Sequence, residues 1–263
     1  MAGIYLFTLN SFGLLFSQFF KMSACIYRPW VLSDKIKPID SALHFAGGYS
    51  FPSGHCGVAS TSFGGLAFLF AKKHKFLCVL LVLLILLVGF SRIYVGVHTP
   101  QDVVVGLLIG LVLVFAINYL IKWCEKDKNR FLYLMCVVNI LVFLLFYYVI
   151  AKDYPIDYLN GEVLVKPQKG IYITILYCGW VFGIVNGAML CKRFFPFEPK
   201  NMSVKSRIIV GAIGLISVIF LMFLIERVFF DDPKPYWITF ISLSAIGFWI
   251  TGLYPLIFRK FLK

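Results

Sequence analysis

The sequence predicts an all-α fold, a polytopic bundle of about eight transmembrane helices, on three observations. Hydrophobic residues make up 60% of the 263 residues, charged residues 14%, and the mean hydropathy is +0.88, whereas a soluble domain is nearer half apolar and a quarter charged. Apolar runs of 16 to 23 residues recur along the whole chain. They lack the period-two alternation of a membrane β-barrel, so helices are expected to be the spanning elements.

Eight runs define the expected helices: 2–20, 55–71, 76–91, 102–122, 131–151, 171–191, 207–227 and 236–258. The second and third runs are the shortest, which suits a thinner or more hydrated part of the bundle. The first run has no basic segment before it, so it does not read as a cleavable signal peptide. Glycines repeat every four residues in the fourth and sixth runs (Gly106 and Gly110; Gly179, Gly183 and Gly187), a spacing typical of close helix–helix packing.

The net charge of +13 reports topology more than a nucleic-acid partner. If the ends of the eight runs alternate sides, one side collects 15 of the 25 basic residues and only three acidic ones, against 10 basic and 9 acidic on the other. Cytoplasmic loops carry such a basic excess. We therefore expect a multi-pass protein of the cell membrane with both termini in the cytoplasm.

The stretch "KMSACIYRP" carries the first cluster of ionisable residues at a membrane surface. Lys21 and Arg28 are seven residues apart, about two helical turns, so on one helix both side chains would point the same way. A lysine and an arginine that close a membrane helix are more often interfacial anchors, so this cluster alone is a weak indication of function.

The stretch "YSFPSGHC" carries the second cluster and has the pattern of a helix start. Ser53 would be the N-cap, Gly54 would let a ligand approach the backbone, and His55 follows immediately. A helix N-terminus binds anions through its free N–H groups. A plain loop-to-helix cap with a surface histidine is an equal alternative.

The stretch "SRIYVGVHTPQD" carries the third cluster. Thr99, Pro100 and Asp102 fit the N-cap, N1 and N3 positions of a capping box, so Asp102 could be purely structural. His98 lies directly before this cap, within reach of the Asp102 carboxylate, and Arg92 closes the preceding helix.

The three clusters fall on the same predicted side, the outer one, and together supply what phosphoryl transfer requires. Three cations, two helix N-termini, two histidines and one aspartate match the needs of a phosphate group, a nucleophile and an acid for the leaving oxygen. No cluster holds enough carboxylates for a catalytic magnesium, and the seven cysteines form no C-x-x-C pair or metal spacing with histidine. We expect metal-independent chemistry with no cofactor.

These motifs resemble the type 2 phosphatidic acid phosphatase superfamily, whose signature is K-x6-R-P, P-S-G-H and S-R-x5-H-x3-D. All three match without a substitution, within residues 21–102. The resemblance implies that His98 is the nucleophile, that Asp102 holds and polarises it, and that His55 protonates the leaving group. It implies a phosphate-binding set of Lys21, Arg28, Arg92, Ser53 and Gly54.

Two features depart from the family pattern. Members of this kind usually have further helices before the first motif, whereas one run precedes it here, which raises the question of an incomplete N-terminus. The four runs after residue 130 extend beyond the usual core. We expect one membrane domain, with residues 1–130 as the phosphatase core and 131–263 as additional transmembrane helices packed on it.

The expected function is hydrolysis of a lipid phosphate or lipid diphosphate at the outer leaflet, through a phosphohistidine. Phospholipid, polyprenyl and sphingoid phosphates are candidate substrates, and the bilayer is the expected surroundings. One alternative is a phosphotransferase that passes the group to a second lipid, and a more distant one is an anion transporter, for which repeated halves are missing. A vanadate-dependent peroxidase would share the anion site but is expected to be soluble. The sequence leaves the particular lipid and the oligomeric state open.

Overall fold

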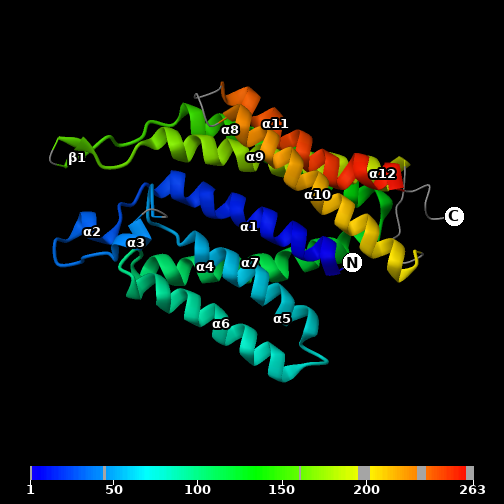
Figure 1. Cartoon of the computed structure of the whole chain (residues 1–263), viewed down its shortest axis with the longest axis horizontal. Helices are drawn as coiled ribbons and strands as arrows, with labels where there is room; N and C mark the ends of the chain where they lie inside the picture. The colour runs from blue at the N-terminus through cyan, green and yellow to red at the C-terminus, as the bar shows by residue number, and fades with distance from the viewer. Residues whose placement is uncertain (1, 44–45, 160, 195–201, 230–234, 259–263) are drawn as a thin grey trace. The chain divides into compact units, whose positions relative to one another are not determined.

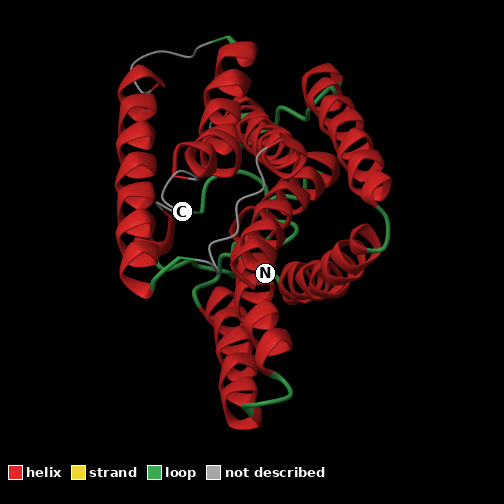
Figure 2. Cartoon of the chain, turned by 90° about the vertical axis from the view of Figure 1, so that its right-hand side faces the viewer, coloured by secondary structure: helices red, strands yellow, loops and turns green. Residues whose placement is uncertain are grey.

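The computed structural model describes residues 2–43, 46–159, 161–194, 202–229 and 235–258, and they are predominantly helical (Figure 2). One short antiparallel hairpin pairs Tyr158 with Val163. In chain order the elements, with η for π-helical segments, are α1 (Ala2–Ala24), α2 (Pro29–Leu32), α3 (Asp40–Leu43), α4 (Gly54–Ala59), η1 (Ser60–Gly64), α5 (Gly65–Phe70), α6 (Lys75–Tyr94), α7 (Pro100–Glu125), α8 (Lys128–Ala151), β1 (Tyr158–Leu159), β2 (Glu162–Val163), α9 (Pro167–Phe194), α10 (Val204–Phe229), α11 (Tyr236–Phe248), η3 (Trp249–Leu253) and α12 (Tyr254–Phe258).

The predicted all-α class is confirmed, and each of the eight apolar runs is helical. Among the described residues, seven helices are long and apolar enough to cross a membrane. The segment expected at 55–71 is the exception: α4, η1 and α5 form a continuous helical stretch over 54–70, about 25 Å long at 1.5 Å per residue. That is short of a hydrocarbon core of about 30 Å.

The chain forms two compact units. Unit 1 comprises Met1–Lys126 and Tyr148–Thr174, and unit 2 comprises Asp127–Tyr147 and Ile175–Lys263. The long helices α8 and α9 each contribute one end to unit 1 and the remainder to unit 2. Unit 1 contains all three sequence motifs.

In unit 1, the segment from α4 to α5 packs tightly against α1 and α7 because glycine lines its contacts. A Cβ on Gly106 of α7 would lie 2.5 Å from the Ser53 carbonyl oxygen, and one on Gly110 would lie 2.4 Å from Ser60 Cβ. At the other end, a Cβ on Gly65 would lie 2.7 Å from Leu9 of α1. The packing role predicted for the glycines of α7 is thus confirmed.

A small apolar core holds α1 and α7 together at the end where α1 begins. Buried Tyr5, Leu9, Leu113 and Val114 form its centre, and Tyr5 Oη donates a hydrogen bond of 2.8 Å to the Val114 carbonyl. The opposite end of unit 1 gathers the end of α1, α2, α3, the start of α4, the end of α6 and the start of α7 (Figure 1). The three motifs therefore meet at one end of the helices.

Unit 2 also uses glycine for close packing. The expected repeat Gly179, Gly183 and Gly187 on α9 faces α11 and η3, where Cβ atoms would come within 2.1 to 2.3 Å of Phe240, Ser244 and Thr251. Between α8 and α9, Asn139 and Asn186 exchange side-chain hydrogen bonds of 3.2 and 3.0 Å. A paired amide of this kind satisfies polar groups that lipid cannot.

Candidate active site

Lys21 and Arg28 converge, but not for the reason that their helical spacing suggested. The helix α1 ends at Ala24, and Cys25 has a left-handed backbone with φ of 52°. Arg28 therefore lies in a turn before α2 and does not share a helix face with Lys21, so the expectation of a common helix was wrong. Both cations instead converge on the loop before α4.

Backbone carbonyls of that loop, together with the Val97 carbonyl before α7, orient the two cations. Lys21 Nζ donates to the carbonyls of Tyr49 and Ser50 at 3.1 and 2.9 Å. Arg28 Nε donates to the Gly48 carbonyl at 3.2 Å, and Arg28 Nη1 donates to Val97 at 2.8 Å. Segment 47–50, which comes just before the P-S-G-H signature, thus fixes the first motif against the second.

His98 and Asp102 form a buried pair at the start of α7. The two side chains are 4% and 1% exposed, and His98 Nδ1 lies 3.3 Å from Asp102 Oδ2. The same carboxylate oxygen accepts the Thr99 backbone N–H at 2.8 Å, while Asp102 N–H donates to Thr99 Oγ1 at 3.2 Å. The predicted capping box is confirmed, and Asp102 both caps the helix and contacts the imidazole.

Ser50 is a member of this cluster that the sequence reasoning missed. Its Oγ donates to Asp102 Oδ2 at 2.5 Å and lies 3.3 Å from His98 Nδ1, and the residue is fully buried. The only indication in the sequence is its position two residues before Pro52, inside a motif-bearing loop. Nothing in its spacing relates it to Asp102.

The hydrogen-bond partner of His98 Nε2 determines which ring nitrogen of the imidazole carries the proton. Arg28 Nη1 lies 3.0 Å from Nε2, and since a guanidinium can only donate, Nε2 must accept and the ring proton belongs to Nδ1. Burial, with the positive charges of Arg28 and Lys21, lowers the pKa of His98 to about 4 against the opposing hydrogen bond to Asp102. His98 is therefore a neutral imidazole at neutral pH, with its lone pair beside a cation.

The second motif lies against the third through the backbone. Ser53 N–H donates to the Asp102 carbonyl at 2.9 Å, and Ser53 occupies the N-cap position of α4 without a side-chain capping bond. Gly54 begins α4, and the Lys21 side chain lies 4.0 Å from where its Cβ would be. The close approach of Lys21 to Gly54 joins the first and second motifs.

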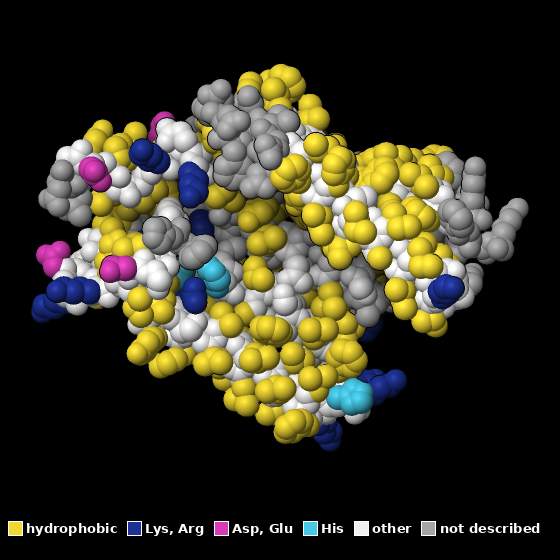
Figure 3. Space-filling view, in the orientation of Figure 1, with side chains coloured by type: hydrophobic (Ala, Val, Ile, Leu, Met, Phe, Trp, Pro, Cys, Tyr) yellow, Lys and Arg dark blue, Asp and Glu magenta, His cyan; other side chains and the backbone are white. Residues whose placement is uncertain are grey.

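His55 and Arg92 lie at the edge of this network. His55 is exposed and Arg92 is half-buried in the last turn of α6, where its described hydrogen bond goes to Ser91. The charges of Arg92, Lys21 and Arg28 act on His55. Figure 3 shows histidine (cyan) and basic (dark blue) side chains together near this end of unit 1. No hydrogen bond joins His55 to the other motif residues in the described part of the chain.

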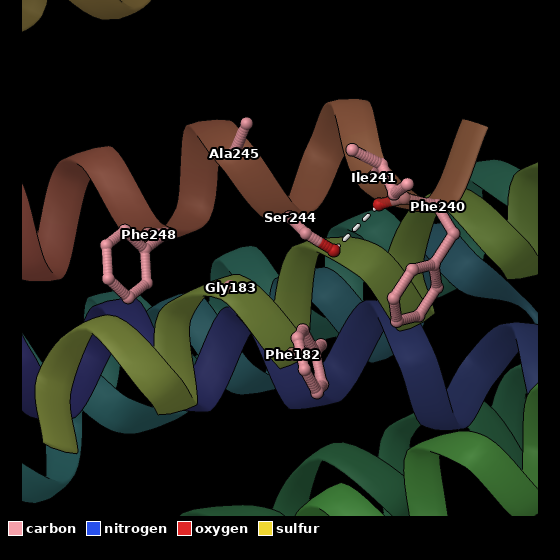
Figure 4. A pocket seen from close by; sticks show the side chains of 7 residues that line it. All are labelled: Phe182, Gly183, Phe240, Ile241, Ser244, Ala245 and Phe248. Carbon is pink, nitrogen blue, oxygen red and sulfur yellow. Dashed lines mark hydrogen bonds between the residues drawn. The ribbon is translucent and has the colours of Figure 1, made fainter. Parts of the chain in front are cut away.

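The pocket described in unit 2 has a mostly apolar lining, unlike the end of unit 1 where the motifs meet. It measures about 330 Å³ and is lined by Phe182, Gly183, Phe240, Ile241, Ser244, Ala245 and Phe248 (Figure 4). Its one hydroxyl, on Ser244, is taken up by a 2.7 Å hydrogen bond to the Phe240 carbonyl. The cations and the histidines of the motifs all belong to unit 1.

Within the described residues, no group of three His, Cys, Asp or Glu side chains is arranged to hold a metal ion.

Two family models match the chain. Residues 2–126 match the model described as the PAP2 superfamily, and residues 175–263 match the model described as the PAP2 superfamily phosphatase, transmembrane extension. The second model and the seven apolar helices make the chain a multi-pass membrane protein. Of the four runs after residue 130, which the sequence left unexplained, three (171–191, 207–227 and 236–258) fall wholly or largely within this extension, and the run 131–151 lies before it.

Curated relatives match over part of the chain. Phosphatidylglycerophosphatase B of Bacillus subtilis is 29% identical over 140 residues, which are 49% of this chain and 66% of the relative. Undecaprenyl-diphosphatase of Sulfolobus acidocaldarius is 44% identical over 62 residues, 24% of this chain and 29% of the relative. Lipid A 4'-phosphatase of Porphyromonas gingivalis is 34% identical over 101 residues, 37% of this chain and 41% of the relative. The chain thus spans less than two thirds of each relative. No solved structure matches it significantly.

Proposed function

The chain belongs to the PAP2 superfamily, and from this premise we propose that it is a membrane-embedded phosphatase that hydrolyses a lipid phosphate or lipid diphosphate through a phosphohistidine intermediate. The three relatives carry the names of lipid phosphatases with different substrates. The shared chemistry is a phosphate on a lipid, and the individual lipid is not part of the proposal.

The contact between Arg28 and His98 carries this proposal. A phosphoryl group bound by the Arg28 guanidinium would lie next to His98 Nε2, because the two nitrogens are 3.0 Å apart. Phosphate oxygens would accept the hydrogen bond that Arg28 now donates to Nε2. The Nε2 lone pair would then be free to face phosphorus. Asp102 holds the opposite ring nitrogen, so the imidazole is oriented for attack in line with the leaving oxygen.

In the first step, Nε2 of His98 forms a bond to phosphorus while the bond from phosphorus to the lipid oxygen breaks. The imidazole gains positive charge, which the Asp102 carboxylate stabilises. Lys21, Arg28, Arg92 and the backbone at Gly54 would neutralise the charge on the phosphoryl oxygens. Assistance by a positioned acid for the departing alkoxide is typically worth about 10²- to 10⁴-fold in rate.

We assign this acid to His55, which in the second step accepts a proton from the attacking water. Water then forms the new bond to phosphorus, the bond to Nε2 breaks, and inorganic phosphate and neutral His98 are restored. Three positive charges act on His55 in the free protein, and a bound phosphoryl anion would offset them. Substrate binding would therefore favour the protonated form that the first step uses.

A lipid is the preferred substrate class because the site lies at the end of membrane-spanning helices. The positive-inside distribution of basic residues assigns this end to the outer face, and both termini to the cytoplasm. Five of the 25 basic residues (Lys200, Lys234, Arg259, Lys260 and Lys263) lie outside the described residues. Residues 1–130 remain our proposal for the phosphatase core, with 131–263 as helices packed on it.

A phosphate-release panel tests the function. Purified full-length protein in detergent would be given phosphatidic acid, phosphatidylglycerophosphate, a polyprenyl diphosphate and a sphingoid phosphate, each with EDTA. Inorganic phosphate released without an added acceptor is the expected result. Strict dependence on magnesium, or transfer to a second lipid without phosphate release, would contradict the proposal.

Accessibility labelling tests the orientation. A single tag in the loop before Pro52 should react with an impermeant reagent in intact cells, and a reporter after Lys263 should not. Reaction at the C-terminus and protection of the loop would reverse the assigned leaflet.

A further inference from the structure

Three serines on α1 behave differently although they share one helix. Ser11 Oγ donates to the Phe7 carbonyl and Ser23 Oγ to the Phe19 carbonyl, both at 2.8 Å, which is the usual way in which a helix satisfies a serine. Ser17 does not. Ser17 as a residue is 6% exposed, and its buried hydroxyl has no hydrogen-bond partner among the described residues.

The position of Ser17 explains where its hydroxyl points. Oγ lies 3.4 Å from where a Cβ on Gly54 would be, and Lys21 Cε lies 4.0 Å from the same point. Ser17 and Lys21 are four residues apart on α1, so they lie one above the other on the same helix face. The two side chains therefore flank Gly54, the first residue of α4.

The groups around Gly54 are rich in donors. Lys21 brings an ammonium, and the fully buried Ser53 hydroxyl, like that of Ser17, has no partner with hydrogen-bond geometry among the described residues. A buried polar group without a partner is destabilising, and such groups in native proteins are few. An anion that only accepts hydrogen bonds would give the two hydroxyls a partner and could accept the remaining N–H of the Lys21 ammonium, which already donates to two carbonyls.

We propose that Ser17 is a further phosphate-binding residue, whose hydroxyl donates a hydrogen bond to an oxygen of the substrate's phosphoryl group beside Gly54. The inference rests on the proposed function and adds to it a residue that lies outside the three motifs. Ser17 lies one helical turn, about 6 Å, before Lys21 along α1.

Two variants of Ser17 and one of Ser11 test this role in the full-length chain. Orthovanadate binding, followed as the shift of the thermal midpoint in detergent, reports on the phosphoryl site without turnover. We expect Ser17→Ala to weaken orthovanadate binding and lower kcat/KM for phosphatidic acid roughly 10- to 100-fold, the effect of a hydrogen bond to a charged group. Ser17→Thr, which keeps the hydroxyl, should restore most of both.

Ser11→Ala is the matched control, since it removes a buried α1 hydroxyl that is satisfied by its own helix. It should leave orthovanadate affinity and kcat/KM unchanged. Unaltered affinity in Ser17→Ala, with a raised thermal midpoint, would mean that the hydroxyl is only an unsatisfied packing group, and would overturn the inference alone. Equal losses in Ser11→Ala and Ser17→Ala would also overturn it. A wild-type protein that neither releases phosphate nor binds orthovanadate would overturn the proposed function as well.

Discussion

Replacing Ser50 by alanine removes the donor of the shortest hydrogen bond that Asp102 accepts. Ser50 Oγ lies 2.5 Å from Asp102 Oδ2, compared with 2.8 Å for Thr99 N–H and 3.3 Å for His98 Nδ1. Water has little access to replace it, because Asp102 is 1% exposed. A hydrogen bond to a charged group contributes about 1.5–3 kcal/mol. If this energy orients and stabilises the carboxylate that supports the His98 imidazolium, its loss corresponds to a fall of about 10- to 100-fold in kcat.

The assay separates chemistry from binding. KM should change much less than kcat, because the contact of Ser50 with Lys21 runs through the Ser50 backbone carbonyl, which alanine keeps. Initial rates on a soluble short-chain phosphatidic acid would give kcat and KM separately. Acid-quenched phosphoenzyme is unsuitable as a readout, because phosphohistidine is acid-labile, so an alkaline quench would follow its formation.

The control is Ser60→Ala. Ser60 is also buried and donates at 3.0 Å to the Leu107 carbonyl, away from Asp102. Both variants should lose some thermal stability, and only Ser50→Ala should lose kcat. Wild-type kcat in Ser50→Ala, or an equal fall in both variants, would refute the view that Ser50 supports the His98–Asp102 pair.

Three further predictions concern pH and packing. The pKa of His98 is about 4 in the folded protein and 6.5 in the unfolded chain. Between these values the unfolded state binds more protons, so the free energy of unfolding should fall by roughly 2 kcal/mol from pH 7 to pH 5. Thermal midpoints of wild type and His98→Gln would show this, since the variant should lose less over the same range. Lys152 Nζ donates to the Ser23 carbonyl at the end of α1, so Lys152→Met should lower the thermal midpoint, with a smaller loss when arginine replaces it. Asn186→Leu removes the amide pair with Asn139 and should cost about 0.6–1.7 kcal/mol of stability without changing kcat; a change in kcat would tie unit 2 to the chemistry.

The sequence predicted those features that depend on local chemistry. The capping box at Thr99 and Asp102 follows from residue types at fixed helical positions, and helix ends obey such local rules. The glycine spacing on α7 predicted close contact because only a missing Cβ lets Ser53 approach. Apolar length predicted the helices because lipid requires every backbone group to be satisfied internally.

What the sequence did not predict depends on tertiary contacts. The prediction that Lys21 and Arg28 share one helix face was wrong because α1 ends at Ala24, and the sequence pattern did not indicate this end. Ser50 and Ser17 are not part of the family signature. Their roles became visible only from the fold, which places Ser50 beside Asp102 and Ser17 beside Gly54. The shortness of the 54–70 segment was visible, but its π-helical turn was not.

The phosphohistidine at His98 is the central claim, and trapping it is the most direct test. Purified wild type would be mixed with a lipid phosphate labelled in its phosphoryl group, quenched in alkali within one turnover, digested and mapped. Label is expected on the peptide that contains His98 and should be absent in His98→Ala. In His55→Ala the label should form more slowly with a lipid alkoxide as leaving group, because the first step lacks its acid. Label on His55, or steady turnover with no trapped label in any variant, would contradict the central claim.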